Sequence, residues 1–186
     1  MQAARGTSLS DDTTTGTSRP TGGSSRIRWV LFAVALTAYA VDVVTKQLAV
    51  RRLADGDVPV LGDWFVLHLT FNPGAAFSLG TSYTVALSCL AITAVVVVLW
   101  LSRRVGSMVW GVALGLLLGG VAGNLTDRLV RDPGPMRGHV VDMFMVPNWP
   151  VFNIADICIN IAAGLIVIQA IRGIALDGTR ERATEQ

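Results

Sequence analysis

Two carboxylates in apolar surroundings are the side chains of this sequence best placed to do chemistry. Asp142 and Asp156 flank a loop bounded by Pro147 and Pro150, and Asp156 lies just inside the apolar run 154–171. An ionisable side chain in such a run is costly and marks a functional site by default. Two acids that share a confined site cannot both ionise cheaply, so one keeps its proton. We therefore expect Asp142 and Asp156 to meet as an acid/base pair.

Such a pair can act as a general base and a general acid in one reaction. The charged carboxylate can take a proton from a water that attacks a carbonyl, and the protonated one can polarise that carbonyl and protonate the leaving amine. Asparagine amides can hold the oxyanion or the substrate backbone without adding charge. Peptide hydrolysis at the membrane surface fits these groups, with no metal or cofactor. From spacing alone, a proton relay in a small transporter or channel subunit is an equally good interpretation.

Other site chemistries lack their residues. The two histidines, His68 and His139, lie in different loops and there is no H-E-x-x-H, so a zinc protease is not expected. There is no G-x-S-x-G nucleophile motif and no P-loop Lys-Ser/Thr. The net charge of +2 is better explained by membrane topology than by a nucleic-acid partner.

A polar face begins the last apolar run. Asn153, Asp156 and Asn160 are spaced i, i+3 and i+7, which places them on one side of a helix. That side must face the protein interior or a wet cavity. For Asn160 we favour an amide contact to another helix over a catalytic role.

The elements that position these groups are those of a membrane protein. The chain has 186 residues, of which 52% are hydrophobic and 15% charged, and a mean hydropathy of +0.54. The first apolar stretch resembles a cleavable secretory signal up to Ala38-Tyr39-Ala40, but its helical pattern continues, which favours an uncleaved span. The four predicted spans are 29–50, 84–101, 108–125 and 154–171.

Small residues and paired charges mark two of these spans. Glycines recur every fourth residue from Gly111 to Gly123, which allows another helix to approach closely. Asp127 extends this stripe by one step. In the first span, Asp42 and Lys46 form an i, i+4 pair, which fits an interfacial ion pair as well as a functional role.

Two segments between the spans are predicted to lie outside the membrane. In residues 51–83, apolar side chains alternate with polar ones from Phe65 to Phe71, which predicts a half-buried strand. Residues 131–152 are predicted as a second outer loop. The flanking segments 1–25 and 176–186 are predicted as a disordered tail and a short polar tail, around a domain of residues 26–175.

Basic residues near the span ends predict the orientation. Most of them lie on one side, which we assign to the cytoplasm together with both termini. They are Arg26, Arg28, Arg103, Arg104 and Arg172, while Arg51, Arg52, Arg131 and Arg137 lie on the other side. A group of polar residues would then gather near the outer leaflet: Asp42, Asn72, Asn124, Asp127, Asp142, Asn153 and Asp156.

Five motifs, in order, resemble those of the lipoprotein signal peptidases (type II signal peptidases). Each is weak alone, but the combination across residues 28–172 is specific. Met143 and Ile157 depart from the residues common in that family without removing a carboxylate. The motifs are Asp42-x-x-Thr45-Lys46, Asn72-Pro73-Gly74-Ala75-Ala76-Phe77-Ser78, Gly123-Asn124-x-x-Asp127-Arg128, Gly138-x-Val140-Val141-Asp142 and Phe152-Asn153-x-Ala155-Asp156.

The resemblance implies a fold and an activity. It implies a membrane all-α protein of four transmembrane helices, with a small extracytoplasmic β-cradle, at about 51–83, between the first and second. It implies an aspartyl endopeptidase of the bacterial cytoplasmic membrane that cuts prolipoproteins before their diacylglyceryl-modified cysteine. Membrane lipid and the cyclic peptide inhibitor globomycin are further implied partners, and the site would lie near the outer leaflet.

The resemblance also implies residue roles. Asp142 and Asp156 match the catalytic dyad. Residues matching those that line the site and hold the substrate are Asn72, Asn124, Arg128 and Asn153. Residues matching those that support the surrounding architecture are Asp42, Lys46, Gly74 and Asp127.

Overall fold

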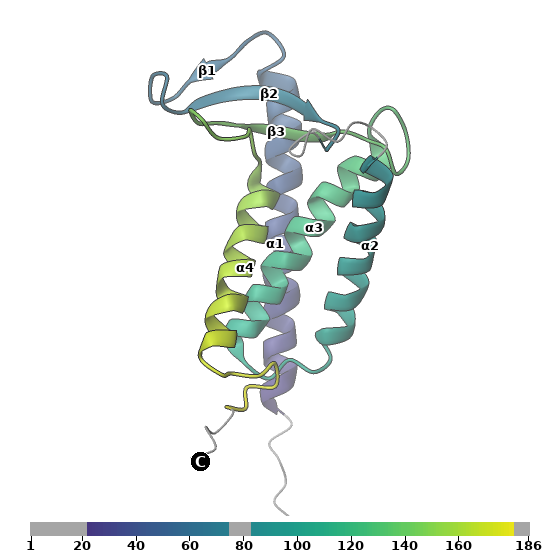
Figure 1. The fold of residues 1–186 in the computed structure, drawn as a ribbon, viewed down its shortest axis with the longest axis vertical. Coiled ribbons are helices and arrows are strands. Elements are labelled where there is room, and N and C mark those ends of the chain that lie inside the picture. The colour runs from purple at the N-terminus through teal and green to yellow at the C-terminus, as the bar shows by residue number, and fades with distance from the viewer. Residues whose placement is uncertain (1–21, 75–82, 181–186) are drawn as a thin grey trace, which may run out of the picture.

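The computed structural model describes residues 22–74 and 83–180, which form a bundle of four helices with a small sheet across one end (Figure 1). All four helices are long and apolar enough to cross a membrane, as predicted. They are α1 (Gly22–Arg52), α2 (Thr84–Leu101), α3 (Met108–Val130) and α4 (Ile154–Ile171).

The helix bounds agree with the sequence except at α1 and α3. Helices α2 and α4 begin and end where the apolar runs do. Helix α1 begins at Gly22 instead of Trp29, so residues 22–25 of the predicted tail are helical, and residues 1–21 lie outside the described part. Helix α3 continues to Val130 instead of Leu125. This extension matters for the site, because it places Asp127 within the last turns of the helix.

The sheet combines both outer segments. Its antiparallel strands are β1 (Val58–Pro59), β2 (Val66–Asn72) and β3 (Val140–Met145), in the order β1-β2-β3. The predicted strand from Phe65 to Phe71 is β2, displaced by one residue. Strand β3 was not predicted, because residues 131–152 were expected to form a loop. It pairs Thr70 with Asp142 and Asn72 with Val140, which brings the two outer segments together.

The end of α1 explains why β3 forms. Val141 and Met143 are buried against Ala49 in the last turn of α1 and against Leu53, the residue that follows the helix. These contacts join residues far apart in the chain, so a local sequence pattern does not reveal them. The sheet is therefore fixed to the bundle through α1, directly above the polar ends of α3 and α4 (Figure 1).

The glycine stripe of α3 allows the predicted close approach of another helix, and that helix is α1. A Cβ atom at Gly115 would lie 2.6 Å from the carbonyl oxygen of Leu31, and one at Gly120 would lie 2.7 Å from that of Ala155 in α4. A Cβ at Gly123 would collide with the carboxylate of Asp42. Glycine thus allows α3 to touch the backbones of two neighbours, and the close α1–α3 seam ends at the polar cluster.

The opposite end of the bundle is apolar. Leu31, Ala35 and Leu114 belong to a buried cluster there, and residues 173–180 fold back beneath it. The indole nitrogen of Trp110 donates to the carbonyl of Ile174 at 3.0 Å. The described part of the predicted C-terminal tail, residues 176–180, is therefore packed against the bundle.

Candidate active site

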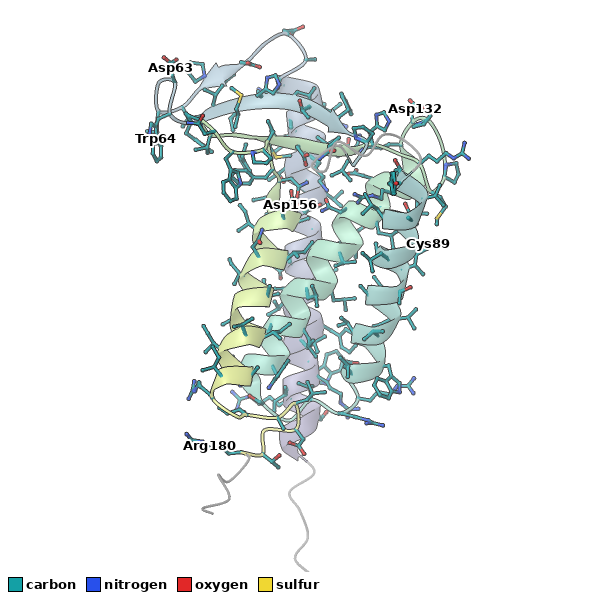
Figure 2. All side chains as sticks on the ribbon, in the orientation of Figure 1. Asp63, Trp64, Cys89, Asp132, Asp156 and Arg180 are labelled. Atoms are coloured by element: carbon teal, nitrogen blue, oxygen red, sulfur yellow. The ribbon has the colours of Figure 1, made fainter. Side chains whose placement is uncertain are left out.

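A cavity of about 660 Å³ lies under the sheet and contains both predicted carboxylates in its wall. Figure 2 shows Asp156 at the end of α4 that lies beneath the sheet. Asp142 comes from β3, and the loop that joins β3 to α4 closes one side. The remaining lining residues are Thr70, Phe71, Asn72, Pro73, Gly74, Leu87, Arg128, Trp149, Pro150, Val151, Phe152 and Asn160.

The start of α4 positions Asp156. Asn153 is the N-cap residue, and its Oδ1 accepts a hydrogen bond from the backbone N–H of Asp156 at 3.0 Å. In return, Oδ2 of Asp156 accepts from the backbone N–H of Asn153 at 3.2 Å. This reciprocal capping box fixes where the helix begins. It leaves Oδ1 of Asp156 and the Nδ2 group of Asn153 available for other partners.

Asp142 is held by two amides. Nδ2 of Asn153 donates to its Oδ1 at 2.6 Å, and Nδ2 of Asn72 donates to its Oδ2 at 2.9 Å. Asn72 is itself held, because its Oδ1 accepts from the backbone N–H of Gly74 at 2.8 Å. Gly74 has a φ of +106°, a conformation that suits glycine. The turn after β2 therefore aims an amide donor at Asp142.

Asn124 of α3 connects the two halves of the site. Its Nδ2 donates to Oδ1 of Asp156 at 2.9 Å. Its Oδ1 accepts from Nδ2 of Asn153 at 3.2 Å and from Nζ of Lys46 at 2.8 Å. Because an ammonium group has only donors, Lys46 requires the oxygen of this amide on its side, and the NH₂ group then faces Asp156.

Lys46 is fully enclosed, and its ammonium group has three oxygen partners. Besides Asn124, its Nζ pairs with Asp42 at 2.7 Å and with Asp127 at 2.9 Å. Asp127 also pairs with Arg131, and Asp42 accepts from the backbone N–H of Ala155 at 2.9 Å. Two cations thus meet two carboxylates beneath the site. This balance is what makes so many buried charges tolerable.

Burial changes the protonation of Asp142. The pKa of its carboxyl group is raised to about 6, mainly because the side chain is removed from water. The hydrogen bond from Asn72 opposes this rise, while the charge of nearby Asp156 adds to it. Asp142 therefore holds its proton well above the pH at which an exposed aspartate loses it.

Among the described residues that line the cavity, Arg128 is the one cation. Its Nη1 donates to the carbonyl oxygen of Asn124 at 3.3 Å, and its Nε is buried without a hydrogen-bond partner in the described part of the chain. The guanidinium thus retains donor capacity beside two acids. It is well suited to hold an acceptor oxygen of a bound molecule.

The predicted site residues gather in one place, but not all of them reach the cavity. Asn72, Gly74 and Arg128 line it. Asn124 and Asn153 instead lie behind the carboxylates that they hold. The supporting residues form the layer beneath: Asp42, Lys46 and Asp127.

Several other residues differ from expectation or were not predicted. The amide of Asn160 donates to the Asp156 carbonyl of its own helix, not to another helix. The aromatic lining residues Phe71 and Phe152 carry no polar signal in the sequence. The N-x-x-D spacing of Asn153 and Asp156 was the available sign of a helix cap. Within residues 22–74 and 83–180, no three His, Cys, Asp or Glu side chains are arranged to hold a metal ion.

Comparison with known proteins places this arrangement in a family. The family model described as signal peptidase (SPase) II matches residues 34–172. The chain is similar to a lipoprotein signal peptidase of Mycobacterium avium, with 45% identity over 92% of this chain and 96% of that protein. It is also similar to one of Leifsonia xyli subsp. xyli, with 44% identity over 82% of this chain and 72% of that protein.

Solved structures support the fold independently. Two structures of a bacterial membrane enzyme resemble this one with TM-scores of 0.68 and 0.69, each at 22% identity. They cover 77% and 85% of this chain, and each match spans 94% of the solved chain. The four-helix fold with its small sheet is thereby confirmed. By the extent of the family match and the identity to its relatives, this chain belongs to the signal peptidase II family, the lipoprotein signal peptidases.

Proposed function

We propose that this membrane protease is an aspartic-type endopeptidase in which Asp142 and Asp156 hydrolyse the peptide bond before the diacylglyceryl-modified cysteine of prolipoproteins. Family membership supports the removal of prolipoprotein signal peptides and does not favour the transporter alternative. The assignment of the two residues rests on one observation. Both carboxylates lie in the wall of one cavity, and each accepts a hydrogen bond from an asparagine amide behind it.

The mechanism requires one proton shared by the two acids. Lys46 and Arg131 already balance Asp42 and Asp127, so Arg128 is the cation left to face the pair. A pair of carboxyl groups that holds one proton carries one negative charge, which matches the positive charge of Arg128. The raised pKa of Asp142 is consistent with a retained proton, although in a coupled pair the proton belongs to both acids.

Hydrolysis then follows by proton transfers to and from the two acids. The ionised carboxylate removes a proton from a water as its oxygen attacks the scissile carbonyl carbon. The protonated carboxyl donates its proton to the carbonyl oxygen, giving a neutral tetrahedral intermediate. As the C–N bond breaks, the acid that took the proton from water gives it to the leaving nitrogen, and the other carboxylate regains its proton from a hydroxyl group of the intermediate. The products are the signal peptide with a new carboxyl end and the lipoprotein with a free amino end.

The other site residues fall into two groups. Arg128 and Asn72 lie in the cavity wall, and we assign them to holding the substrate. Asn124 and Asn153 are buried behind the acids, and we assign them to orienting the carboxylates. Trp149 lies in the wall but is largely exposed, as suits a residue that contacts substrate at the mouth of the cavity.

The protein is a multi-pass protein of the bacterial inner membrane. We propose that both termini lie in the cytoplasm and that the sheet and the site lie at the outer surface. Arginines near the sheet-distal ends of the spans support this orientation. Cysteine residues introduced at exposed Asp63 and Arg172 give the test. A membrane-impermeant thiol reagent applied to intact cells should label the first and not the second, and the reverse would contradict the orientation.

The activity is tested with the purified full-length chain and a diacylglyceryl-modified precursor, followed by gel mobility shift. Asp142→Asn and Asp156→Asn should each lower turnover by about 10²- to 10⁴-fold, because each removes one of the two proton-transfer groups. Asp63→Asn is the matched control, since Asp63 is exposed and distant from Asp156 (Figure 2). Near-wild-type turnover in either site variant would refute the dyad.

Class-specific inhibitors separate the aspartic assignment from other chemistries. We expect activity to survive chelators and serine or thiol reagents, because the nucleophile is a water activated by a carboxylate, and the reaction needs no metal and no serine or cysteine nucleophile. Loss of activity in EDTA would instead indicate a metal site. We also expect globomycin to block cleavage by occupying the cavity, and full activity at saturating globomycin would contradict that partner.

A further inference from the structure

A second hollow, of about 390 Å³, shares no lining residue with the proposed active site. It lies between the last turns of α1 and the sheet. Thr45, Leu48 and Arg52 line it from the helix, and Leu67, Met143 and Phe144 line it from β2 and β3. Its volume is within the range of about 300–1,000 Å³ that is typical of ligand sites. We call it the α1 groove.

The α1 groove is apolar except at one end. Arg52, at the sheet end, is the one charged residue among the described residues that line it. At the other end, Thr45 satisfies its hydroxyl within its own helix, because Oγ1 donates to the carbonyl of Val41 at 2.8 Å. The seven-residue step from Thr45 to Arg52 corresponds to about 10 Å of helix. The polarity of the groove thus complements that of a lipid, because it has a charge at the membrane surface and an apolar slot beneath.

The positive charge at the end of the groove lacks a counter-charge. Arg51 and Arg52 are exposed, and neither forms an ion pair within the described ranges. Below them, Val44 and Leu48 are about half exposed on the outer surface of the span. A ligand that complements this place must therefore be anionic at one end and apolar along the rest.

We propose that the α1 groove binds an anionic phospholipid, with one acyl chain along Leu48 and the phosphate at Arg52. Basic pockets at the ends of membrane helices bind anionic headgroups in this way. An arginine suits the phosphate, since its planar donors fit two oxygens at once. With the proposed orientation, the lipid comes from the outer leaflet of the inner membrane.

The bound lipid would contact the strand that carries Asp142. Met143 is the next residue of β3, and it forms part of the groove wall. It also packs with Val141 against α1. A chain in the groove fills the space behind β3 and holds the strand against the helix. The lipid site therefore supports the geometry of the active site without touching a substrate.

The test measures retained lipid and does not depend on activity. The full-length chain in neutral detergent micelles is incubated with phosphatidylglycerol or phosphatidylcholine, and native mass spectrometry counts the bound molecules. We expect one phosphatidylglycerol per chain, retained in preference to phosphatidylcholine. Arg52→Gln should weaken retention about fivefold, the effect of one cation at an anionic lipid surface. Leu48→Trp should abolish it by filling the groove, and both sites are exposed enough for the variants to fold.

Arg51→Gln is the matched control, because it removes the same charge from a neighbouring exposed position outside the groove. We expect it to change retention by less than twofold. Equal losses in Arg51→Gln and Arg52→Gln would indicate general attraction to an anionic surface and overturn the site. So would unchanged retention in Leu48→Trp, or equal retention of the two lipids. A dimer that retains no lipid would assign the groove to a second copy of the chain instead.

Discussion

At the sheet-distal end of the bundle, α1 and α3 meet through Leu31, Ala35 and Leu114, whereas at the sheet end the same two helices meet through Lys46, Asp127 and Asn124. The glycine stripe runs along the contact between these ends. The two regions bring the same helices together by opposite means. One excludes water from apolar side chains, and the other buries charges that balance one another.

The two ends therefore contribute differently: the apolar end stabilises the bundle, and the polar end positions particular atoms. Apolar contact is non-directional, so it stabilises the bundle without dictating where any one atom lies. A hydrogen bond has preferred distances and angles, so the polar end determines which atom of Asn124 faces Asp156. Buried charges are a poor means of adding stability, because desolvation offsets their attraction. Their presence at one end is therefore better explained by the positioning of the two acids.

Lys46→Met should give the largest effect at the polar end. It leaves Asp42 and Asp127 buried with their shared cation removed, a change that costs about 3–5 kcal/mol of unfolding free energy. It also removes the donor that orients Asn124, so turnover per folded molecule should fall. Thermal unfolding in micelles measures the first effect, and precursor cleavage measures the second.

A double-mutant cycle tests the route from Lys46 to the acids. If Lys46 acts on turnover through Asn124, Lys46→Met combined with Asn124→Ala should be no slower than Asn124→Ala alone. If the two losses multiply instead, Lys46 affects the reaction by another route. That result would contradict the view that the polar end acts by positioning Asn124.

Leu114→Ala is the corresponding change at the apolar end. Leu114 is almost fully buried, and its truncation should cost about 2–5 kcal/mol through lost contacts and a cavity. Turnover per folded molecule should stay within about twofold of wild type, because no directional contact to the acids is lost. A loss of turnover comparable to that of Lys46→Met, in protein shown to be folded, would remove the distinction between the ends.

Stability should depend on pH through Asp142. Its pKa is about 6 in the folded chain against an ordinary 3.8, so the folded state binds the proton more tightly than the unfolded state. Stability should therefore fall as pH rises from about 4 to above 6, by up to roughly 3 kcal/mol, and then level off. Unfolding temperatures at pH 5 and pH 7.5 measure this slope. Asp142→Asn should flatten the dependence of stability on pH, and Asp63→Asn should leave it unchanged. An unchanged slope in Asp142→Asn would contradict the role of Asp142 in this dependence.

Gly74→Ala should give the smallest loss of stability, together with slower cleavage at the site. A Cβ there lies 2.8 Å from Cδ1 of Leu87, and the positive φ adds about 1–3 kcal/mol of strain. The displaced turn would carry the amide of Asn72 away from Asp142 and slow cleavage. Gly62→Ala is the control, since its φ is +56° but open space surrounds it. Equal effects of the two variants on turnover would mean that the turn at Gly74 does not serve the site.

Much of the fold could be predicted because a membrane imposes strong local rules. Helices α2 and α4 end where their apolar runs end, since each span must be continuous and apolar. The spacing of the glycine stripe also predicted a close helix neighbour, but not that this neighbour is α1. Strand β3 could not be predicted, because the burial of Val141 and Met143 depends on their contact with α1. The same residue pattern also occurs in loops.

The candidate site was predictable as a set of residues, not as an arrangement. The apolar run indicated Asp156, helical spacing indicated Asn153, and the i, i+4 pair indicated Lys46. The motifs added the expected roles of Asn72 and Asn124. The spacing did not show that Asn124 and Asn153 lie behind the acids while Arg128 and Asn72 face the cavity. These placements depend on side-chain directions set by packing between four separate elements.

The sequence by itself determined that four apolar helices would form and that a few polar residues would have to find one another at one end. The physical reason is the high cost of leaving a charge or an unpaired polar group in a medium without water. The tertiary structure alone decided which oxygen and which nitrogen meet: the register of β3 on β2, the contact of Lys46 with Asn124, and the cavity that opens between Asp142 and Asp156. The contact of Lys46 with Asn124 joins residues that are 78 positions apart, so no local pattern of residues encodes it.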